Sequence, residues 1–267
     1  MPRERIGDVE LYYELSGSGD EVFAFVNGVA MTVQSWAPIR ELVEGGFRCL
    51  LHDTRGQLMS EKPAADYTME MHAGDLANLL DHVGIERVHL AGTSYGAEIA
   101  MIFAAEHQER VETLHVITGV SELDGVLRAA TESWAVGAKH GIGPLFRSMI
   151  PWTYSSGYLE ENAALLDDRE KLLGQLPEDY LEGFVRLVRA FHGLDISDRL
   201  GSISCPTLVI AAENDLVKPL RFSERIHERI PDSELVVIPD SGHAVVVEDP
   251  ESVARHMLDF IARRSRS

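Results

Sequence analysis

A serine between two glycines is the first candidate for chemistry in this sequence. Ser94 stands in Gly92-Thr93-Ser94-Tyr95-Gly96. This is the G-x-S-x-G spacing of a nucleophile elbow, a sharp turn that lifts the hydroxyl clear of the backbone. Glycine suits both flanking positions because larger side chains would collide there. The same five residues could also form a plain glycine-rich turn, so the neighbouring elements and partner residues must decide the interpretation.

A serine hydroxyl is a poor nucleophile unless a base takes its proton and another group orients that base. The sequence supplies both kinds of group after later apolar runs. Glu213 and Asp215 follow the run at residues 207–212, and His243 follows the run at 234–238. Together with Ser94, these residue types can transfer an acyl group to water through a covalent intermediate.

The candidates can meet only if the segments before them are strands of one sheet. Residues 88–91 predict a short buried strand before Ser94, and apolar residues at helical spacing follow it. The run at 22–26 is continuously apolar, as in strands that are buried on both faces, and residues 47–51 (Phe-Arg-Cys-Leu-Leu) predict the next buried strand. Strands that alternate with helices predict an α/β fold with a mostly parallel sheet. Active groups in such sheets gather at the carboxyl ends of the strands.

The pattern changes between about residues 122 and 200, where helical stretches alternate with Gly and Pro and no strand run occurs. We therefore expect residues 1–121 and 201–267 to form the core and residues 122–200 to form an inserted helical cap. Trp134, Trp152 and Tyr154 of this segment are candidates to line a pocket under the cap. Packing between helices would use the same side chains.

The length, composition and net charge of the chain indicate its fold size and disfavour some classes of binding partner. The chain has 267 residues, 45% of them apolar, which suits one large α/β domain. Its formal net charge of -19 disfavours nucleic acid and anionic membrane surfaces as partners. No apolar run is long enough to span a bilayer and no apolar leader follows Met1, so the sequence predicts a cytoplasmic location. Cys49 and Cys205 lie in or beside apolar segments, which predicts free cysteines in the core.

Four motifs in this order resemble those of the α/β-hydrolase superfamily. They are D-x-R-G at 53–56, G-x-S-x-G at 92–96, N-D-x-x-x-P at 214–219 and S-G-H at 241–243. The resemblance spans nearly the whole chain apart from the cap. Within the superfamily, the sequence most resembles the 3-oxoadipate enol-lactonase-like and small carboxylesterase branch. The fold implied is a mostly parallel central sheet with helices on both faces and an inserted helical cap.

The resemblance also implies a role for each candidate. Ser94 is the nucleophile, His243 is the general base and then the general acid, and Asp215 orients the imidazole. The spacing of the third motif favours Asp215 over Glu213. Asp124 occupies the other position from which some relatives supply the acid.

The sequence departs from its relatives at the expected oxyanion hole. Asn27-Gly28 replaces the usual His-Gly, and these two residues would support a loop in which the backbone N–H of Val29 is one oxyanion donor. The N–H of Tyr95 is the other. An Asn amide can form hydrogen bonds comparable to those of the missing histidine. A second departure is Gly96-Ala97-Glu98, where relatives often have a second glycine. Glu98 is an unusual charge in this helix and would lie near the positive end of the helix dipole or at the surface.

The sequence therefore predicts a serine hydrolase that cleaves a small carboxylic ester and uses no metal or organic cofactor. A lactone, a thioester or a carbon–carbon bond could be cleaved by the same residues, because substrate choice depends on the cap. A ligand-binding receptor with a very slow triad is the alternative from another class of protein. A fluorophosphonate probe that reacts with Ser94 would separate the two. The pattern leaves open whether the chain is a monomer or a homodimer.

Overall fold

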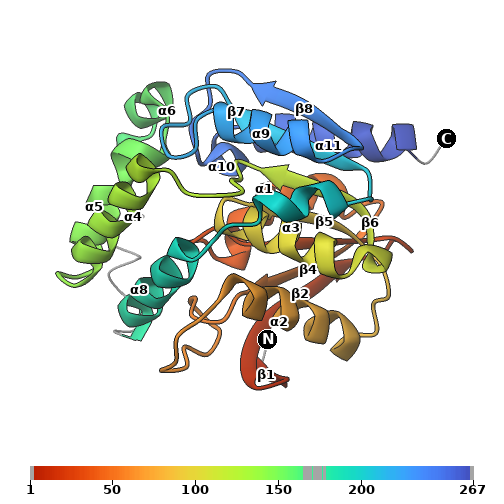
Figure 1. Ribbon diagram of the computed structural model, residues 1–267, viewed down its shortest axis with the longest axis horizontal. Coiled ribbons are helices and arrows are strands. Elements are labelled where there is room, and N and C mark those ends of the chain that lie inside the picture. The colour runs from red at the N-terminus through yellow and green to blue at the C-terminus, as the bar shows by residue number, and fades with distance from the viewer. Residues whose placement is uncertain (1–2, 165–169, 171–175, 177–178, 265–267) are drawn as a thin grey trace.

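An eight-stranded sheet runs through the computed structural model, which describes residues 3–164, 170, 176 and 179–264 (Figure 1). The strands are β1 (Arg3–Ile6), β2 (Val9–Gly17), β3 (Val22–Val26), β4 (Arg48–Asp53), β5 (Val88–Thr93), β6 (Val111–Ile117), β7 (Thr207–Ala212) and β8 (Ser233–Ile238). The helices are α1 (Ala37–Val43), α2 (Met69–His82), α3 (Tyr95–Glu106), α4 (Gly125–Ala138), α5 (Ile142–Thr153), α6 (Ser156–Glu161), α8 (Asp179–His192), α9 (Arg221–Arg229), α10 (Val245–Glu248) and α11 (Pro250–Arg264).

The strand order is β1-β2-β4-β3-β5-β6-β7-β8. β2 is antiparallel to both β1 and β4, whereas the pairs from β4 to β8 are parallel. The carboxyl ends of β5, β7 and β8 therefore lie along one edge of the sheet. This arrangement confirms the predicted α/β fold with a mostly parallel central sheet.

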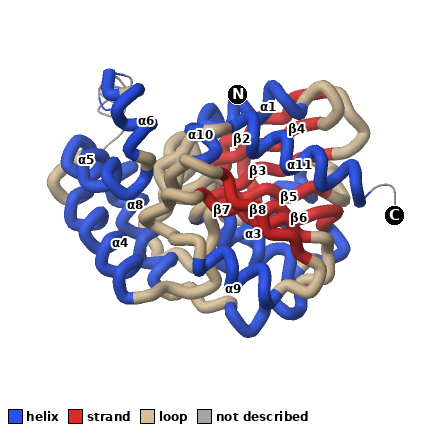
Figure 2. The backbone as a smooth tube through the Cα atoms, turned by 90° about the horizontal axis from the view of Figure 1, so that it is seen from above, coloured by secondary structure: helices blue, strands red, loops and turns tan. Residues whose placement is uncertain are grey.

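Helices cover both faces of the sheet (Figure 2). Phe23 and Phe25 of β3 belong to a core cluster that includes residues of α1, α10 and α11. Ala24 and Val26 of the same strand point to the opposite face and belong to a cluster that includes residues of α2, α3 and α9. All four side chains are buried, which explains why the strand is a continuous apolar run.

Helices α4, α5, α6 and α8 lie between β6 and β7 in the chain and gather beside the sheet as a separate group (Figure 2). This group falls in the segment for which the sequence predicts a cap. Residues 165–169, 171–175 and 177–178 of that segment lie outside the described residues.

The strand β1 was not indicated by the sequence pattern. Its residues Arg-Glu-Arg-Ile pair with β2 at the edge of the sheet, and Ile6 is the one buried side chain of the four. Cys49 and Cys205 are free and buried. Within the described residues, no helix is both long enough and apolar enough to cross a membrane.

Candidate active site

Ser94 lies between β5 and α3 with a strained backbone, φ 52° and ψ −119°. A non-glycine residue with positive φ costs free energy and persists where the surroundings enforce it. The two flanking glycines explain how the turn closes. A Cβ at Gly92 would overlap the carbonyl oxygen of Gly96, and one at Gly96 would overlap that of Val26. The segment therefore has the tight strand-to-helix turn that is expected of a nucleophile elbow.

The loops after β7 and β8 bring a histidine and a carboxylate to this serine. Nε2 of His243 lies 2.8 Å from Oγ of Ser94, and Nδ1 of His243 lies 2.7 Å from Oδ2 of Asp215. With Nδ1 protonated, the imidazole donates to Asp215 and accepts the proton of the Ser94 hydroxyl. This is the hydrogen-bond order needed to activate a serine.

The second oxygen of Asp215 fixes the carboxylate. Oδ1 accepts the backbone N–H groups of Val217 and Lys218, each at 2.8 Å. The two alternative acids have other partners. Glu213 accepts the N–H of Asp240, and Asp124 accepts the N–H of Leu127 at the start of α4 and also pairs with Arg221. Of the three carboxylates, the structure places Asp215 on the histidine.

The loop after β3 lies against Ser94. A Cβ at Gly28 would stand 3.0 Å from Sδ of Met31 and 3.3 Å from Cβ of Ser94, so a larger residue would fit only if these neighbours moved slightly. Asn27 anchors the loop: its Oδ1 accepts the indole N–H of Trp36 at 2.8 Å, and its Nδ2 donates to Asp53 at 3.0 Å. Hydrogen bonds of the replacement amide thus hold the loop on which Val29 lies.

The buried carboxylate of Asp53 accepts several of the hydrogen bonds that hold this loop in place. Besides Asn27, its carboxylate accepts the backbone N–H groups of Val33 and Met59. Burial raises the pKa of Asp53 to about 6, and the hydrogen bonds that it accepts limit that rise. Asp53 touches neither Ser94 nor His243 through these bonds, so its place is beside the site rather than in it.

Glu98 is fully buried, which excludes the surface position left open by the sequence. Its carboxylate accepts two hydrogen bonds from Nζ of Lys218, at 2.9 and 3.0 Å, and one from the backbone N–H of Val120 at 2.8 Å. Burial raises the pKa of the Glu98 carboxyl, and the Lys218 ammonium opposes that rise.

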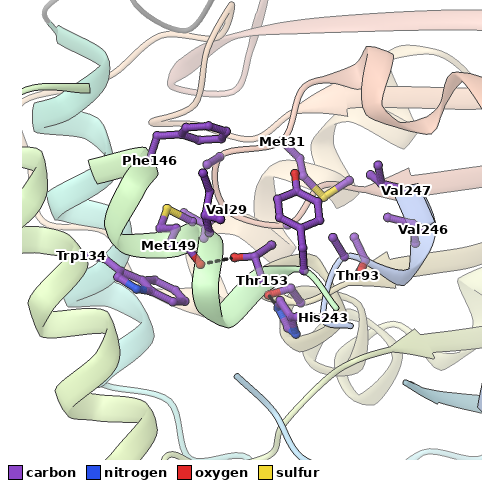
Figure 3. A pocket seen from close by; sticks show the side chains of 16 residues that line it. Val29, Met31, Thr93, Trp134, Phe146, Met149, Thr153, His243, Val246 and Val247 are labelled. Carbon is purple, nitrogen blue, oxygen red and sulfur yellow. Dashed lines mark hydrogen bonds between the residues drawn. The ribbon is translucent and has the colours of Figure 1, made fainter. Parts of the chain in front are cut away.

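A cavity of about 760 Å³, here called the large cavity, opens at Ser94 and His243. Figure 3 shows Trp134, Phe146 and Met149 from the helices after β6 on one side of it and Met31, Val246 and Val247 on the other. No Lys, Arg, Asp or Glu is among its lining residues in the described part of the chain. The large cavity therefore suits an uncharged, mostly apolar group.

A second cavity of about 340 Å³, here called the small cavity, also touches Ser94. Its lining residues include Tyr95, Val188, Phe191 and Lys218. Val29, Ser94 and Trp134 line both cavities, so Ser94 stands where the two meet.

The three aromatic residues predicted to line a pocket have different positions. Trp134 lines both cavities and Tyr154 lines the large one, whereas Trp152 packs against the main core cluster. Sequence reasoning missed the lining role of Met31, Met149, Val246 and Val247. Nothing distinguishes these side chains from core residues in a sequence.

The described residues contain no group of three or more His, Cys, Asp or Glu side chains that could hold a metal ion.

A comparison with protein families matches residues 21–250 to the α/β-hydrolase fold family. The chain belongs to the α/β-hydrolase family. This result confirms the family predicted from the four motifs, and the relatives' names agree that the chain is a hydrolase.

Two relatives in sequence are similar over almost their whole length. The putative carbamate hydrolase RutD of Caulobacter sp. (strain K31) is 28% identical, with 94% of this chain and 96% of the relative covered. The 2-hydroxy-6-oxononadienedioate/2-hydroxy-6-oxononatrienedioate hydrolase of Paraburkholderia xenovorans (strain LB400) is 29% identical, with 97% and 93% covered.

Among solved structures, the enol-lactonase from Burkholderia xenovorans LB400 superimposes with a TM-score of 0.90. The match covers 98% of this chain and 100% of the enol-lactonase at 24% sequence identity. At that identity the likeness shows the shared fold.

Proposed function

We propose that this α/β-hydrolase cleaves small, uncharged carboxylic esters through an acyl-enzyme on Ser94. The observation that carries the proposal is the unbroken hydrogen-bond chain from Ser94 Oγ through His243 to Asp215, at 2.8 and 2.7 Å. A structural protein has no need of such a chain at a strained serine, whereas a serine hydrolase needs each of its members.

In the first half of the reaction, Ser94 Oγ attacks the ester carbonyl carbon while its proton moves to Nε2 of His243. Asp215 stabilises the imidazolium that forms. The negative charge on the carbonyl oxygen is met by the backbone N–H groups of Val29 and Tyr95. When the tetrahedral intermediate collapses, the carbon–oxygen bond breaks and the imidazolium protonates the departing alcohol.

In the second half, water replaces the alcohol beside His243. The imidazole takes a proton from this water as its oxygen attacks the acyl carbon. A second tetrahedral intermediate then collapses, Ser94 Oγ recovers its proton from His243, and the carboxylic acid leaves. The cycle uses one water molecule and needs no redox partner.

The lining of the large cavity favours a neutral ester over a charged substrate. The Paraburkholderia relative is named for a dioate, which carries two carboxylates. A site for such a dianion would need cations, and the described lining of the large cavity offers none. Lys218 of the small cavity is already paired with Glu98. Carbon–carbon cleavage of a dianion is therefore a weaker proposal, and a neutral lactone or carbamate ester fits the same cavity.

We also propose that the helices between β6 and β7 act as a cap on this site. Trp134 from α4 and Phe146 and Met149 from α5 line the large cavity, so these helices supply one wall of the substrate pocket. Substrate preference should then change with these side chains and leave the triad intact.

The proposal is tested with p-nitrophenyl acetate, butyrate and octanoate as substrates. We expect Ser94→Ala and His243→Ala to lower kcat at least about 10³-fold, the scale seen when a triad member is removed. A fluorophosphonate probe should label the native protein and leave Ser94→Ala unlabelled. A native protein that binds ligands but neither reacts with the probe nor turns over these esters would instead be a receptor.

A further inference from the structure

An ion pair beside the triad is not used by the mechanism above. Glu98 lies in the first turn of α3, which begins directly after Ser94, and Lys218 lies three residues after Asp215. The Glu98 side chain is 0% exposed and that of Lys218 is 2% exposed. Both charges are thus removed from water between the nucleophile helix and the loop of the catalytic acid.

Lys218 forms hydrogen bonds both to the loop of the catalytic acid and to helix α3. Its backbone N–H donates to Oδ1 of Asp215, and its ammonium donates to both carboxylate oxygens of Glu98. Its ammonium also lies 5.0 Å from the centre of the Phe191 ring. One residue therefore connects the carboxylate that orients His243 to the helix that carries the nucleophile.

Glu98 also forms a hydrogen bond to the segment after β6. Its Oε1 accepts the backbone N–H of Val120, which follows β6. Three loops at the carboxyl edge of the sheet are thereby held together: the elbow, the segment after β6 and the acid loop.

A buried ion pair is a poor means of stabilising a fold. Withdrawing two charges from water costs about as much free energy as their attraction returns, and apolar side chains of similar size are often as stable. A buried pair is more useful for fixing geometry, because it allows few alternative arrangements.

We infer that Glu98 and Lys218 are positioning residues, which hold the Asp215 loop in place relative to Ser94. The inference rests on the proposed function. It explains why Glu98, a departure from the family pattern in α3, is paired with a charge in the acid loop. Small displacements of a catalytic group can lower a rate by up to about 10²-fold, so loosening this link should lower kcat.

The deciding variant removes both charges together. In Glu98→Gln/Lys218→Met, the Gln carbonyl can still accept the N–H of Val120, and Met keeps the apolar length of the lysine that lines the small cavity. No unpaired charge stays buried. We expect the thermal midpoint to remain within a few degrees of the native value, while kcat for p-nitrophenyl acetate falls roughly 10- to 100-fold and KM changes less than about twofold. Lys218→Met alone leaves Glu98 unpaired and should lower the midpoint.

The matched control is Arg40→Met/Glu14→Gln, which removes a partly buried ion pair between α1 and β2. Glu14 accepts hydrogen bonds from Tyr12 and Gln34. It lies on β2, near the opposite edge of the sheet from β7, the strand that precedes the acid loop. Its kcat should match that of the native protein.

Three results would overturn the inference. One is a double variant with native kcat, and another is a rise in KM at constant kcat, which would assign the pair to substrate binding. If the double variant does not fold, Lys218→Met alone decides, because it removes the ammonium that links Glu98 to the Asp215 loop, and native kcat in that variant is the third. Failure of the proposed function is distinguished from these results because the native protein itself would then be inactive.

Discussion

Nδ2 of Asn27 donates a hydrogen bond of 3.0 Å to Oδ1 of Asp53, and this contact joins the loop after β3 to the end of β4. Both side chains are fully buried. The contact holds the loop that carries Gly28 and Val29 beside Ser94. The oxyanion site proposed for Val29 therefore depends on an amide side chain at position 27.

Replacing Asn27 by Ala should damage both stability and catalysis. The change leaves the indole N–H of Trp36 without its acceptor and removes one donor from Asp53. We expect the free energy of unfolding to fall by about 1–3 kcal/mol, the cost of a buried unpaired polar group, and kcat to fall at least about tenfold. Urea unfolding and ester hydrolysis measure the two effects. A variant with full activity would show that this loop does not supply the oxyanion site.

Asp215→Asn tests the tautomer of the histidine. Because Oδ1 is held by two backbone N–H groups, the amide of an Asn would keep its oxygen there and turn its NH₂ toward Nδ1 of His243. His243 would then carry its proton on Nε2 and could not take the proton of Ser94. We expect kcat to fall about 10⁴-fold with little change in thermal stability.

Glu213→Gln is the matched control for this experiment. Glu213 lies two residues from Asp215 and accepts the N–H of Asp240, a bond that a Gln carbonyl can also accept. Its activity should stay within a few-fold of the native value. A larger loss than that of Asp215→Asn would contradict the assignment of the acid.

Chain-length preference should depend on Phe146. This side chain of α5 lines the large cavity, so Phe146→Ala makes room for a longer group. Because each buried methylene is worth about 0.8 kcal/mol, room for about two more methylenes should raise the ratio of kcat/KM for octanoate over butyrate roughly tenfold. Trp152→Ala is the control, since Trp152 packs against the main core cluster. An equal change in both variants would argue against α5 as a wall of the substrate pocket.

The sequence predicted well those features that depend on local pattern. The buried strand before Ser94, the two glycines and the charged or polar residues after β7 and β8 all follow from spacing and hydrophobicity along the chain. The edge strand β1 was missed because three of its four residues are charged and lie at the rim of the sheet.

Contacts between distant segments could not be predicted in the same way. The sequence showed that Glu98 is an unusual charge in an apolar helix, but it did not indicate the partner, Lys218, which lies 120 residues later in the chain. Trp152 lies in the last turn of α5 and Tyr154 directly follows that helix, yet Tyr154 lines the large cavity and Trp152 does not. Which face of a helix meets a cavity depends on how the helix is docked, and one sequence does not reveal that.

Stability should also fall in mild acid, because several histidines are buried in the neutral form. Burial lowers the pKa of His52 to about 4 and those of His72 and His115 to about 3. The unfolded chain binds these protons near pH 6.5, so it holds more protons than the folded chain at lower pH. The contribution of these histidines to the free energy of unfolding is therefore fully present above about pH 6.5 and declines as the pH falls toward 4. Asp53 acts in the opposite direction, since its raised pKa favours the folded state as the pH falls through about 6.

His52→Leu isolates one of these contributions. Neither ring nitrogen of His52 has a hydrogen-bond partner among the described residues, so the change removes a buried polar group that nothing satisfies. We expect the free energy of unfolding at pH 7 to rise by about 1–3 kcal/mol. Between pH 6.5 and 4.5 its loss should be smaller than in the native protein by about 1 kcal/mol per pH unit. Urea unfolding at several pH values measures both, with the exposed His140→Gln as control. An unchanged slope in His52→Leu would mean that His52 takes up its proton in the folded protein near pH 6.5.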